Sequence, residues 1–236
     1  QEPHAQVSSA CPVLVDLIAK YHNWAVGMVT PIVSPMIAHG RYLKSKYGAE
    51  AKVVFIGPCP AKKAEAEQPD LAGIIDAVLT FEELRTWVVS AEVKIDQLRS
   101  VDMDDLPASQ ARVFPLEGGL ALAASLRPDL LRQDFAAVSG IVEVKEMLDN
   151  LRAGSSIKLF EALFCPGGCI NGACFGDARD VFRRRNWVLQ HERRTQRKAE
   201  EEDIRAAMEN VELRRTISEK SIGLMQFSEE EIREVM

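Results

Sequence analysis

Three of the five cysteines in this chain are followed directly by proline, namely Cys11, Cys59 and Cys165. Proline is favoured at the first position of a helix, because its ring presets φ and a backbone N–H would have no partner there. The preceding cysteine then lies at a loop-to-helix junction, where free N–H groups and the positive helix end favour a thiolate. This pattern predicts cysteines at the ends of separate elements, in places from which they can meet at one anionic site.

The segment Cys165-Pro166-Gly167-Gly168-Cys169 is the most specific motif in the chain. Its two glycines allow positive φ angles, so that the backbone can approach a bulky cofactor without a clash at Cβ. Its two thiolates favour a soft metal. A zinc knuckle usually has two short pairs of Cys or His ligands, whereas this chain has one such pair and no histidine at a ligand-like spacing. Thiolates from distant segments therefore favour an iron–sulfur cluster over zinc.

Patterns typical of strands and helices alternate along the chain. Apolar runs that indicate buried strands occupy residues 52–57, 74–79, 135–139 and 157–160. Helical patterns begin after Cys11, after Ser34 and after a capping box at Thr80, and another covers residues 142–152. Strands that alternate with helices predict an α/β fold with mainly parallel sheets flanked by helices.

The chain is expected to divide into one domain and an extension. Residues 1–180 would form a domain of two α/β lobes, with the boundary between the lobes near residues 95–110, where the sequence is acidic and irregular. Residues 181–236 would form a helical C-terminal extension that leads to a further downstream region. Its basic and acidic blocks fit a long solvated helix with charge pairs at helical spacing, or a docking surface for an electron carrier or signalling partner.

Composition excludes several classes of protein. The hydrophobic fraction of 47% is too high for a disordered chain, and the net charge of -6 argues against a general nucleic-acid binder. No apolar run approaches the ~20 residues that a membrane span needs, so no membrane partner is expected. The odd number of cysteines does not fit a secreted disulfide framework, which favours a reducing, cytoplasmic location.

Three segments resemble, in the same order and at comparable separation, the signature motifs of the catalytic domain of iron-only hydrogenases: residues 9–12, 58–65 and 161–172. Residues 75–80 and the pair Gly118-Gly119 match further stretches of that family. The resemblance implies two α/β lobes with a cofactor between them. That cofactor is a [4Fe-4S] cluster joined through a cysteine sulfur to a di-iron subcluster, which carries CO, cyanide and a bridging dithiolate.

The resemblance also implies which residues hold the cofactor. Cys11, Cys59, Cys165 and Cys169 would ligate the four-iron cluster, and Cys169 would also bridge to the di-iron subcluster. Lys62 corresponds to a lysine that donates a hydrogen bond to a cyanide ligand, a role that suits an ammonium with three donors. The alternative for this residue is an ordinary solvated lysine.

Two further residues correspond to groups near the cofactor of this family. Glu161 matches a glutamate beside the third motif, and Ser34 matches a serine of the proton route. Each has a structural alternative, as a structural carboxylate or as an N-cap residue. Together with Lys62, these two residues are the predicted catalytic groups.

The chain departs from the active enzymes of the family at several positions. Ala10 replaces a cysteine that relays protons, Gly57 and Leu163 replace methionines that pack against the cofactor, and Cys174 and Phe175 replace glycine and glutamine. A relay that lacks one donor is expected to be slow, because general acid–base transfer contributes ~10²–10⁴-fold in rate. These departures resemble the sensory, PAS-linked branch of the family.

The resemblance therefore implies a hydrogenase of low turnover, which cleaves H2 reversibly and serves in sensing of H2 or of redox state. The implied partners are H2 and protons, a ferredoxin-like electron carrier or in-chain iron–sulfur clusters, and a PAS or kinase output module.

Two alternatives stay open. One is a high-turnover, ferredoxin-linked hydrogenase subunit, and the other is an iron–sulfur scaffold or assembly module without a di-iron site. Lys62 and Cys169 argue against the scaffold, because it needs no lysine that faces a cyanide. A cysteine-nucleophile hydrolase is a remote option, since no histidine is convincingly placed to activate a thiol.

Overall fold

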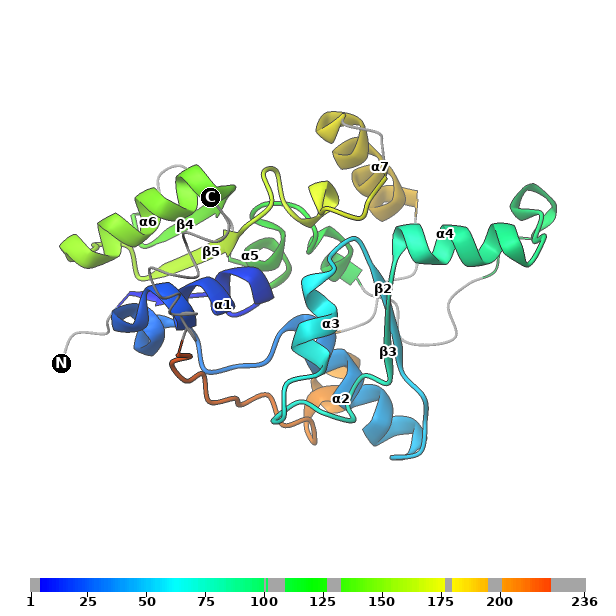
Figure 1. Cartoon of the computed structure of the whole chain (residues 1–236), viewed down its shortest axis with the longest axis horizontal. Helices are drawn as coiled ribbons and strands as arrows, with labels where there is room; N and C mark the ends of the chain where they lie inside the picture. The colour runs from blue at the N-terminus through cyan, green and yellow to red at the C-terminus, as the bar shows by residue number, and fades with distance from the viewer. Residues whose placement is uncertain are drawn as a thin grey trace, which may run out of the picture.

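The computed structural model contains two β-sheets, and the strands within each sheet run parallel (Figure 1). One sheet has the strand order β1–β5–β4, formed by Gln6–Val7, Leu159–Leu163 and Phe135–Ser139. The other sheet pairs β2 (Val54–Gly57) with β3 (Ala77–Thr80). The structure describes residues 5–99, 101, 109–126, 133–176, 180–194 and 201–221. Helices flank both sheets, so the predicted α/β class is confirmed.

The first lobe forms around the β1–β5–β4 sheet. Helix α1 (Pro12–Tyr21), the short 3-10 helix η1 (Asn23–Met28) and helix α6 (Ile141–Ala153) share one hydrophobic core with it. Helix α6 ends at Gly154, whose φ of 91° requires glycine or strain. Fully or almost fully buried members of this core are Val7, Leu14, Ile18, Val144, Leu148 and Phe160.

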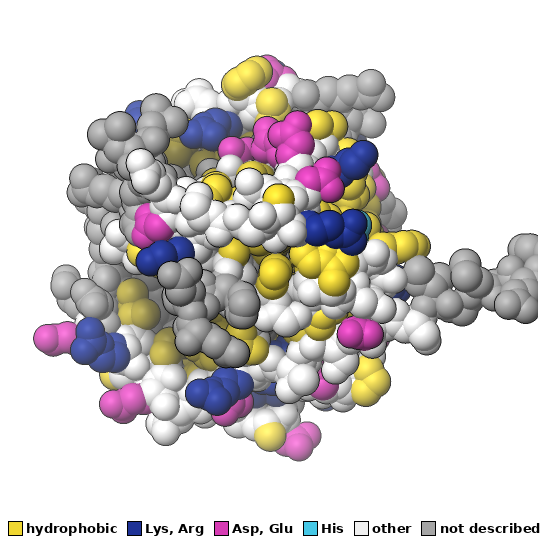
Figure 2. Space-filling model, turned by 90° about the vertical axis from the view of Figure 1, so that its left-hand side faces the viewer, with side chains coloured by type: hydrophobic (Ala, Val, Ile, Leu, Met, Phe, Trp, Pro, Cys, Tyr) yellow, Lys and Arg dark blue, Asp and Glu magenta, His cyan; other side chains and the backbone are white. Residues whose placement is uncertain are grey.

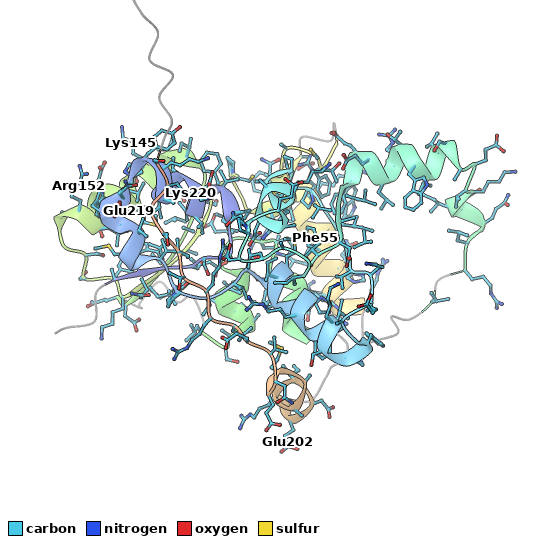
Figure 3. All side chains as sticks on the ribbon, turned by 60° about the horizontal axis from the view of Figure 1, so that its bottom comes forward. Phe55, Lys145, Arg152, Glu202, Glu219 and Lys220 are labelled. Atoms are coloured by element: carbon cyan, nitrogen blue, oxygen red, sulfur yellow. The ribbon has the colours of Figure 1, made fainter. Side chains whose placement is uncertain are left out.

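The second lobe forms around the β2–β3 sheet. It contains the helices α2 (Pro35–Tyr47), α3 (Ala61–Ala66) and α4 (Phe81–Ser90), followed by the 3-10 helix η2 (Ile95–Gln97). Its buried core consists of Val33, Met36, Ile37, Val53, Leu71 and Ile75. The capping box predicted at Thr80 and Glu83 is confirmed, because each residue's side chain accepts from the other's backbone N–H. Helix α4 buries none of its residues and projects away from the body (Figures 1 and 3).

A third packed group lies behind the cysteine-rich turn. It contains η3 (Ser109–Val113), α5 (Gly119–Ala123), η4 (Cys169–Asn171) and α7 (Val181–Arg194). Val113, Leu116 and Ile170 form its buried centre, with side chains of α7 packed against it. This group fixes the turn against the first lobe.

The two lobes interleave along the chain. Strand β1, near the N-terminus, pairs with β5 in the register Gln6↔Leu159, although β2 and β3 lie between them in sequence. A single boundary near residues 95–110 would place β1 and β2 in the same lobe, whereas the pairing of β1 places it with β4 and β5. The cysteine that follows β1 is thereby brought beside the cysteines that follow β5.

The C-terminal extension is helical only in part. Helix α8 (Glu201–Met208) follows α7, and residues 211–221 are then extended; we call these residues the C-terminal strap. Its backbone pairs with the segment that links the lobes, because Val33 donates to Leu213 O at 2.9 Å and Arg215 to Pro31 O at 3.0 Å. Figure 3 shows the strap leaving α8, where Glu202 points outward, and reaching Glu219 and Lys220 beside α1.

Basic and acidic side chains lie side by side on the face seen in Figure 2, with apolar side chains between them. That face therefore carries no extended area of a single charge. Among the described residues, no helix is long and apolar enough to cross a membrane.

Candidate metal centre

The four cysteines of the motifs lie at the ends of different elements. Cys11 is the N-cap residue of α1 and is followed by proline at the first helical position, as the Cys–Pro pattern predicts. Cys59 follows β2, and α3 begins two residues later at Ala61. Cys165 follows β5 at the start of a turn, and Cys169 opens η4. The Cys–Pro pattern thus marked residues that follow strands, but only Cys11 is directly followed by a helix that begins at its proline.

The thiols of these cysteines are near enough to shift one another's ionisation. Burial, and then repulsion from Cys11 and Cys59, raises the pKa of Cys165 to about 11. Burial also raises the pKa of Cys169 to about 12, with Cys11, Cys165 and Cys59 adding to the effect and Lys62 opposing it.

The pKa of Cys11 is raised as well, chiefly by burial, although the amides of Leu14 and Phe164 oppose this. Thiols with such values are neutral at pH 7 unless a metal cation replaces their protons. These mutual effects place the four cysteines in one neighbourhood, while their role as ligands of one cluster stays a prediction.

Lys62 is buried beside this group of thiols. Its exposed fraction is 9%, and its ammonium forms an ion pair with Glu65 Oε2 at 2.7 Å and donates to Ala10 O at 3.3 Å. The solvated alternative therefore does not describe this side chain. Glu65 was not identified from the sequence, although its position three residues after Lys62 on one helix face was a usable signal.

Ser34 and Glu161 have different surroundings. Ser34 is the N-cap residue of α2 and is fully buried, but its hydroxyl makes no capping bond and has no hydrogen-bond partner among the described residues. Glu161 accepts from the N–H groups of Leu120 at 3.2 Å and Ala121 at 2.8 Å, at the start of α5. Burial raises the pKa of Glu161, and those N–H groups oppose the rise. These contacts are those of a structural carboxylate.

The turn between Cys165 and Cys169 has the predicted glycine conformation. Gly167 and Gly168 have φ angles of 75° and 100°. A Cβ on Gly168 would lie 2.4 Å from Pro115 O, so the turn approaches the neighbouring backbone too closely for any other residue. The segment that contains Pro115 also pairs with the turn, through an isolated β-bridge between Leu116 and Gly168.

Cys174, the fifth cysteine, lies next to the segment that carries Cys59. Its N–H donates to Pro58 O at 3.0 Å. Burial raises the pKa of its thiol, as do the carboxylates of Glu82 and Glu83 and, more weakly, Cys59. This surrounding is more acidic than that of the other cysteines, which makes Cys174 the natural control for ligand substitutions.

An apolar pocket of about 380 Å³ lies beside the residues that precede the first cysteine. Ser9 and Ala10, the two residues before Cys11, form part of its wall, and Ile204 and Met208 of α8 form another part. The residue that replaces a proton-relaying cysteine in the resemblance thus faces an apolar space rather than a polar one.

The donor set fits an iron–sulfur cluster. Within the described ranges, no three His, Cys, Asp or Glu side chains are arranged around a single metal ion. Four thiols from four element ends, of which those of Cys11, Cys165 and Cys169 have raised pKa values, suit a larger cluster with thiolate ligands. The lysine beside them supplies a positive charge and hydrogen-bond donors.

Comparison with curated proteins finds two kinds of relative. The chain is 26% identical over 211 residues to the NADP-reducing hydrogenase subunit HndD of Solidesulfovibrio fructosivorans, a match that covers 70% of this chain and 36% of the relative. It is 23% identical over 226 residues to a probable cytosolic Fe-S cluster assembly factor of Drosophila willistoni, covering 73% of this chain and 47% of the relative. The chain thus spans less than half the length of these relatives.

Solved structures of [FeFe]-hydrogenases share the fold. A variant of HydA1 from Chlamydomonas reinhardtii has a TM-score of 0.70 at 17% identity, covering 94% of this chain and 78% of that chain. Another [FeFe]-hydrogenase, from work on oxygen inactivation of the H cluster, has a TM-score of 0.67 at 18% identity, covering 92% and 76%. The model of the family described as "Iron only hydrogenase large subunit, C-terminal domain" matches residues 1–173, and the chain belongs to that family.

Proposed function

We propose that Cys11, Cys59, Cys165 and Cys169 hold a [4Fe-4S] cluster, and that the matured full-length protein cleaves H2 reversibly at a di-iron subcluster linked through Cys169. The observation that carries this proposal is that the thiols of Cys11, Cys165 and Cys169 have raised pKa values and lie near Cys59 and the buried Lys62. When bound, the subcluster with its CO, cyanide and dithiolate ligands would supply the heterolytic H2 chemistry.

The residues of the chain have three tasks in this proposal. The thiols release their protons and bind iron, which makes the affinity for iron depend on pH. Lys62 has three donors, of which Glu65 and Ala10 engage two, so that the third serves to bind a cyanide. The pocket beside Ala10 presents a mostly apolar wall on this side of the site.

The lack of an exchangeable proton at residue 10 supports the proposal of a sensory role. Ala10 has no exchangeable proton, and Ser34, the proposed member of the proton route, lies fully buried with an unpartnered hydroxyl in the described part of the chain. We therefore propose low turnover in H2 or redox sensing, with electrons passed to a ferredoxin-like carrier or in-chain clusters and a PAS or kinase module as output. A cytoplasmic location would keep the five thiols, all free in the structure, reduced.

Reconstitution of the chain with iron and sulfide tests the cluster. We expect a broad brown absorbance and about four irons per chain. A triple Cys11→Ser, Cys59→Ser and Cys165→Ser variant should lose this iron, whereas Cys174→Ser should retain it. Unchanged iron content in the triple variant would contradict the proposal.

The relative named as an assembly factor favours a second candidate, a cluster-binding module without a di-iron subcluster. Infrared spectroscopy of the full-length protein, coexpressed with maturation enzymes, separates the two. CO and cyanide stretches support the hydrogenase-like function. A protein with a full complement of cluster iron but without these stretches would be the assembly-type module.

A further inference from the structure

A chain of hydrogen bonds connects a carboxylate to the cysteine turn. Ser139, at the end of β4, is buried, and its hydroxyl donates to Glu117 Oε2. The hydroxyl oxygen of Ser139 also accepts a hydrogen bond from the N–H of Gly167 at 2.9 Å. A hydroxyl has one proton, and here the proton is given to the carboxylate, so that a lone pair faces the amide.

The surroundings fix this chain of contacts. Ser139 is held by its own N–H, which donates to Glu143 Oε2 at 2.8 Å. Glu117 follows Leu116, which pairs with Gly168, and precedes Gly118 in the left-handed conformation at φ 75°. The segment around Glu117 therefore contacts the turn twice, once through its backbone and once through Ser139.

Gly167 lies between the two cysteines of the turn, so its N–H belongs to the short backbone segment that carries both proposed ligands. An N–H that donates to a cysteine or cluster sulfur makes reduction easier, because it stabilises the added negative charge. Ser139 engages this N–H instead. The carboxylate of Glu117 adds a negative charge behind the turn, which makes reduction harder.

We infer that Glu117 and Ser139 are positioning residues that keep the reduction potential of the cluster low, by holding the Gly167 N–H away from sulfur and by placing a negative charge behind the turn. This inference rests on the proposed function, because it needs a cluster on Cys165 and Cys169. It assigns roles to two residues outside the cysteine motifs.

Three variants separate the two contributions. Ser139→Ala removes the acceptor and frees the Gly167 N–H for sulfur, so we expect the largest shift of the potential to more positive values. Glu117→Gln keeps an oxygen that can accept from Ser139 but removes the charge, so a smaller positive shift is expected. Ser139→Thr retains the hydroxyl and should restore a potential close to that of the wild type.

The experiment is a redox titration, followed by electron paramagnetic resonance, of the full chain reconstituted with iron and sulfide. Glu146→Gln, on the exposed side of α6, changes the net charge equally and should leave the potential unchanged. Iron content and circular dichroism are measured for every variant. If Ser139→Ala fails to fold, the difference in reduction potential between Glu117→Gln and Glu146→Gln still tests the inference.

The outcomes are distinct. Positive shifts in Ser139→Ala and Glu117→Gln, with rescue in Ser139→Thr, support the inference. Iron-replete Ser139→Ala and Glu117→Gln variants with the wild-type potential would overturn it while leaving the proposed function intact. A wild-type chain that binds no iron would overturn the proposed function, and this inference with it.

Discussion

The ammonium of Lys62 donates to the carbonyl oxygen of Ala10 at 3.3 Å, and this contact joins α3 of the second lobe to the start of α1 in the first. The same ammonium is paired with Glu65, which is 2% exposed. A charged bridge between the lobes therefore lies next to Cys11. Its position means that the geometry of the site depends on how the two lobes pack.

Removal of Glu65 should weaken the fold. The Glu65→Ala variant leaves the buried ammonium of Lys62 without its carboxylate, and breaking a buried ion pair in this way costs about 3–5 kcal/mol. Urea unfolding of the metal-free protein measures this. Glu67, two residues further along the chain, is exposed, so Glu67→Ala is the control and should change stability by about 0.5 kcal/mol or less. Equal effects of the two substitutions would show that the ion pair of Lys62 and Glu65 does not stabilise the fold.

Stability of the metal-free protein should fall at alkaline pH. Burial raises the pKa of Cys165 to about 11 and of Cys169 to about 12, against about 8.5 for an exposed thiol. Between the pKa of an exposed thiol and the raised pKa values of Cys165 and Cys169, the folded chain therefore binds more protons than the unfolded chain. The contribution of these thiols to stability is thus complete below about pH 8.5 and is lost as the pH rises through their folded pKa values.

The measurement is the urea midpoint as a function of pH, for the wild type and for a Cys165→Ser, Cys169→Ser double variant. The difference between them isolates the two thiols from the lysines that titrate in the same range. We expect the wild-type midpoint to fall more steeply above about pH 8.5. Parallel curves would mean that the thiols ionise as easily in the folded chain as in the unfolded one.

Restoration of a thiol at residue 10 should accelerate H2 evolution. Ala10 borders the apolar cavity and has no proton to pass on. Ala10→Cys in the fully loaded, full-length protein should therefore raise the rate within the ~10²–10⁴-fold range of general acid catalysis. The gain is reduced if Gly57 and Leu163 also slow the site, since neighbouring changes need not add.

The assay for Ala10→Cys compares H2 evolution from a strong reductant with that of the wild type. Iron content is the control, and it should not change because the proposed ligand Cys11 is retained. Equal rates would mean that proton relay does not limit this protein, and that pocket polarity or electron supply does.

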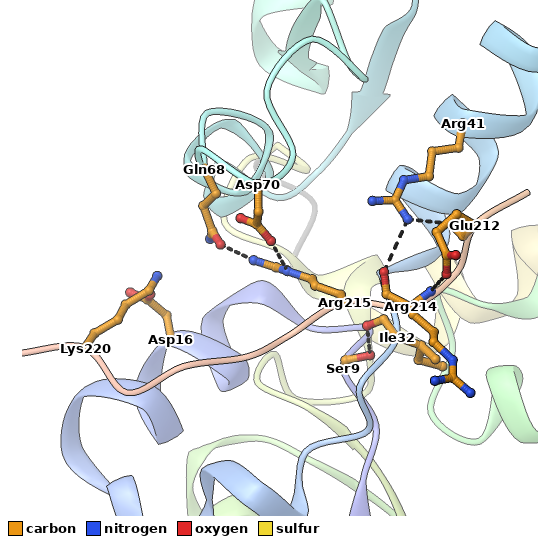
Figure 4. A network of polar contacts seen from close by, with 10 residues as sticks. All are labelled: Ser9, Asp16, Ile32, Arg41, Gln68, Asp70, Glu212, Arg214, Arg215 and Lys220. Carbon is orange, nitrogen blue, oxygen red and sulfur yellow. Dashed lines mark hydrogen bonds and ion pairs between the residues drawn. The ribbon is translucent and has the colours of Figure 1, made fainter.

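The C-terminal strap should stabilise the packing of the lobes. Arg215 donates to Asp70 Oδ2 at 2.9 Å and to Gln68 in the second lobe, while Lys220 pairs with Asp16 of α1 in the first (Figure 4). Arg215 is the more buried end of its pair, with 8% of its side chain exposed. Arg215→Ala should therefore lower the free energy of unfolding by about 1–2 kcal/mol.

Arg214→Ala is the matched control for the strap, because this neighbouring side chain is exposed and points away from Asp70 (Figure 4). Urea unfolding of both variants provides the comparison. A loss in Arg214→Ala as large as that in Arg215→Ala would show that the contacts of Arg215 with Asp70 and Gln68 make no specific contribution to stability.

The local features of this protein can be predicted from short stretches of its sequence. The capping box of Thr80 and Glu83, the helix start after Cys11, and the glycine turn before Cys169 each depend on residues within a few positions of one another. Such signals are strong because capping, proline stereochemistry and glycine φ angles act locally. The family motifs and the α/β class followed from these local patterns.

The tertiary structure alone decided which of these features meet. The pairing of β1 with β5 brings Cys11 to the cysteine turn, and it interleaves the two lobes in a way that no local pattern shows. The contacts of Glu117 with Ser139 and of Arg215 with Asp70 join residues that are 22 and 145 positions apart. Their formation depends on how two sheets and their helices exclude water together, and that packing is set by the whole chain rather than by any one segment.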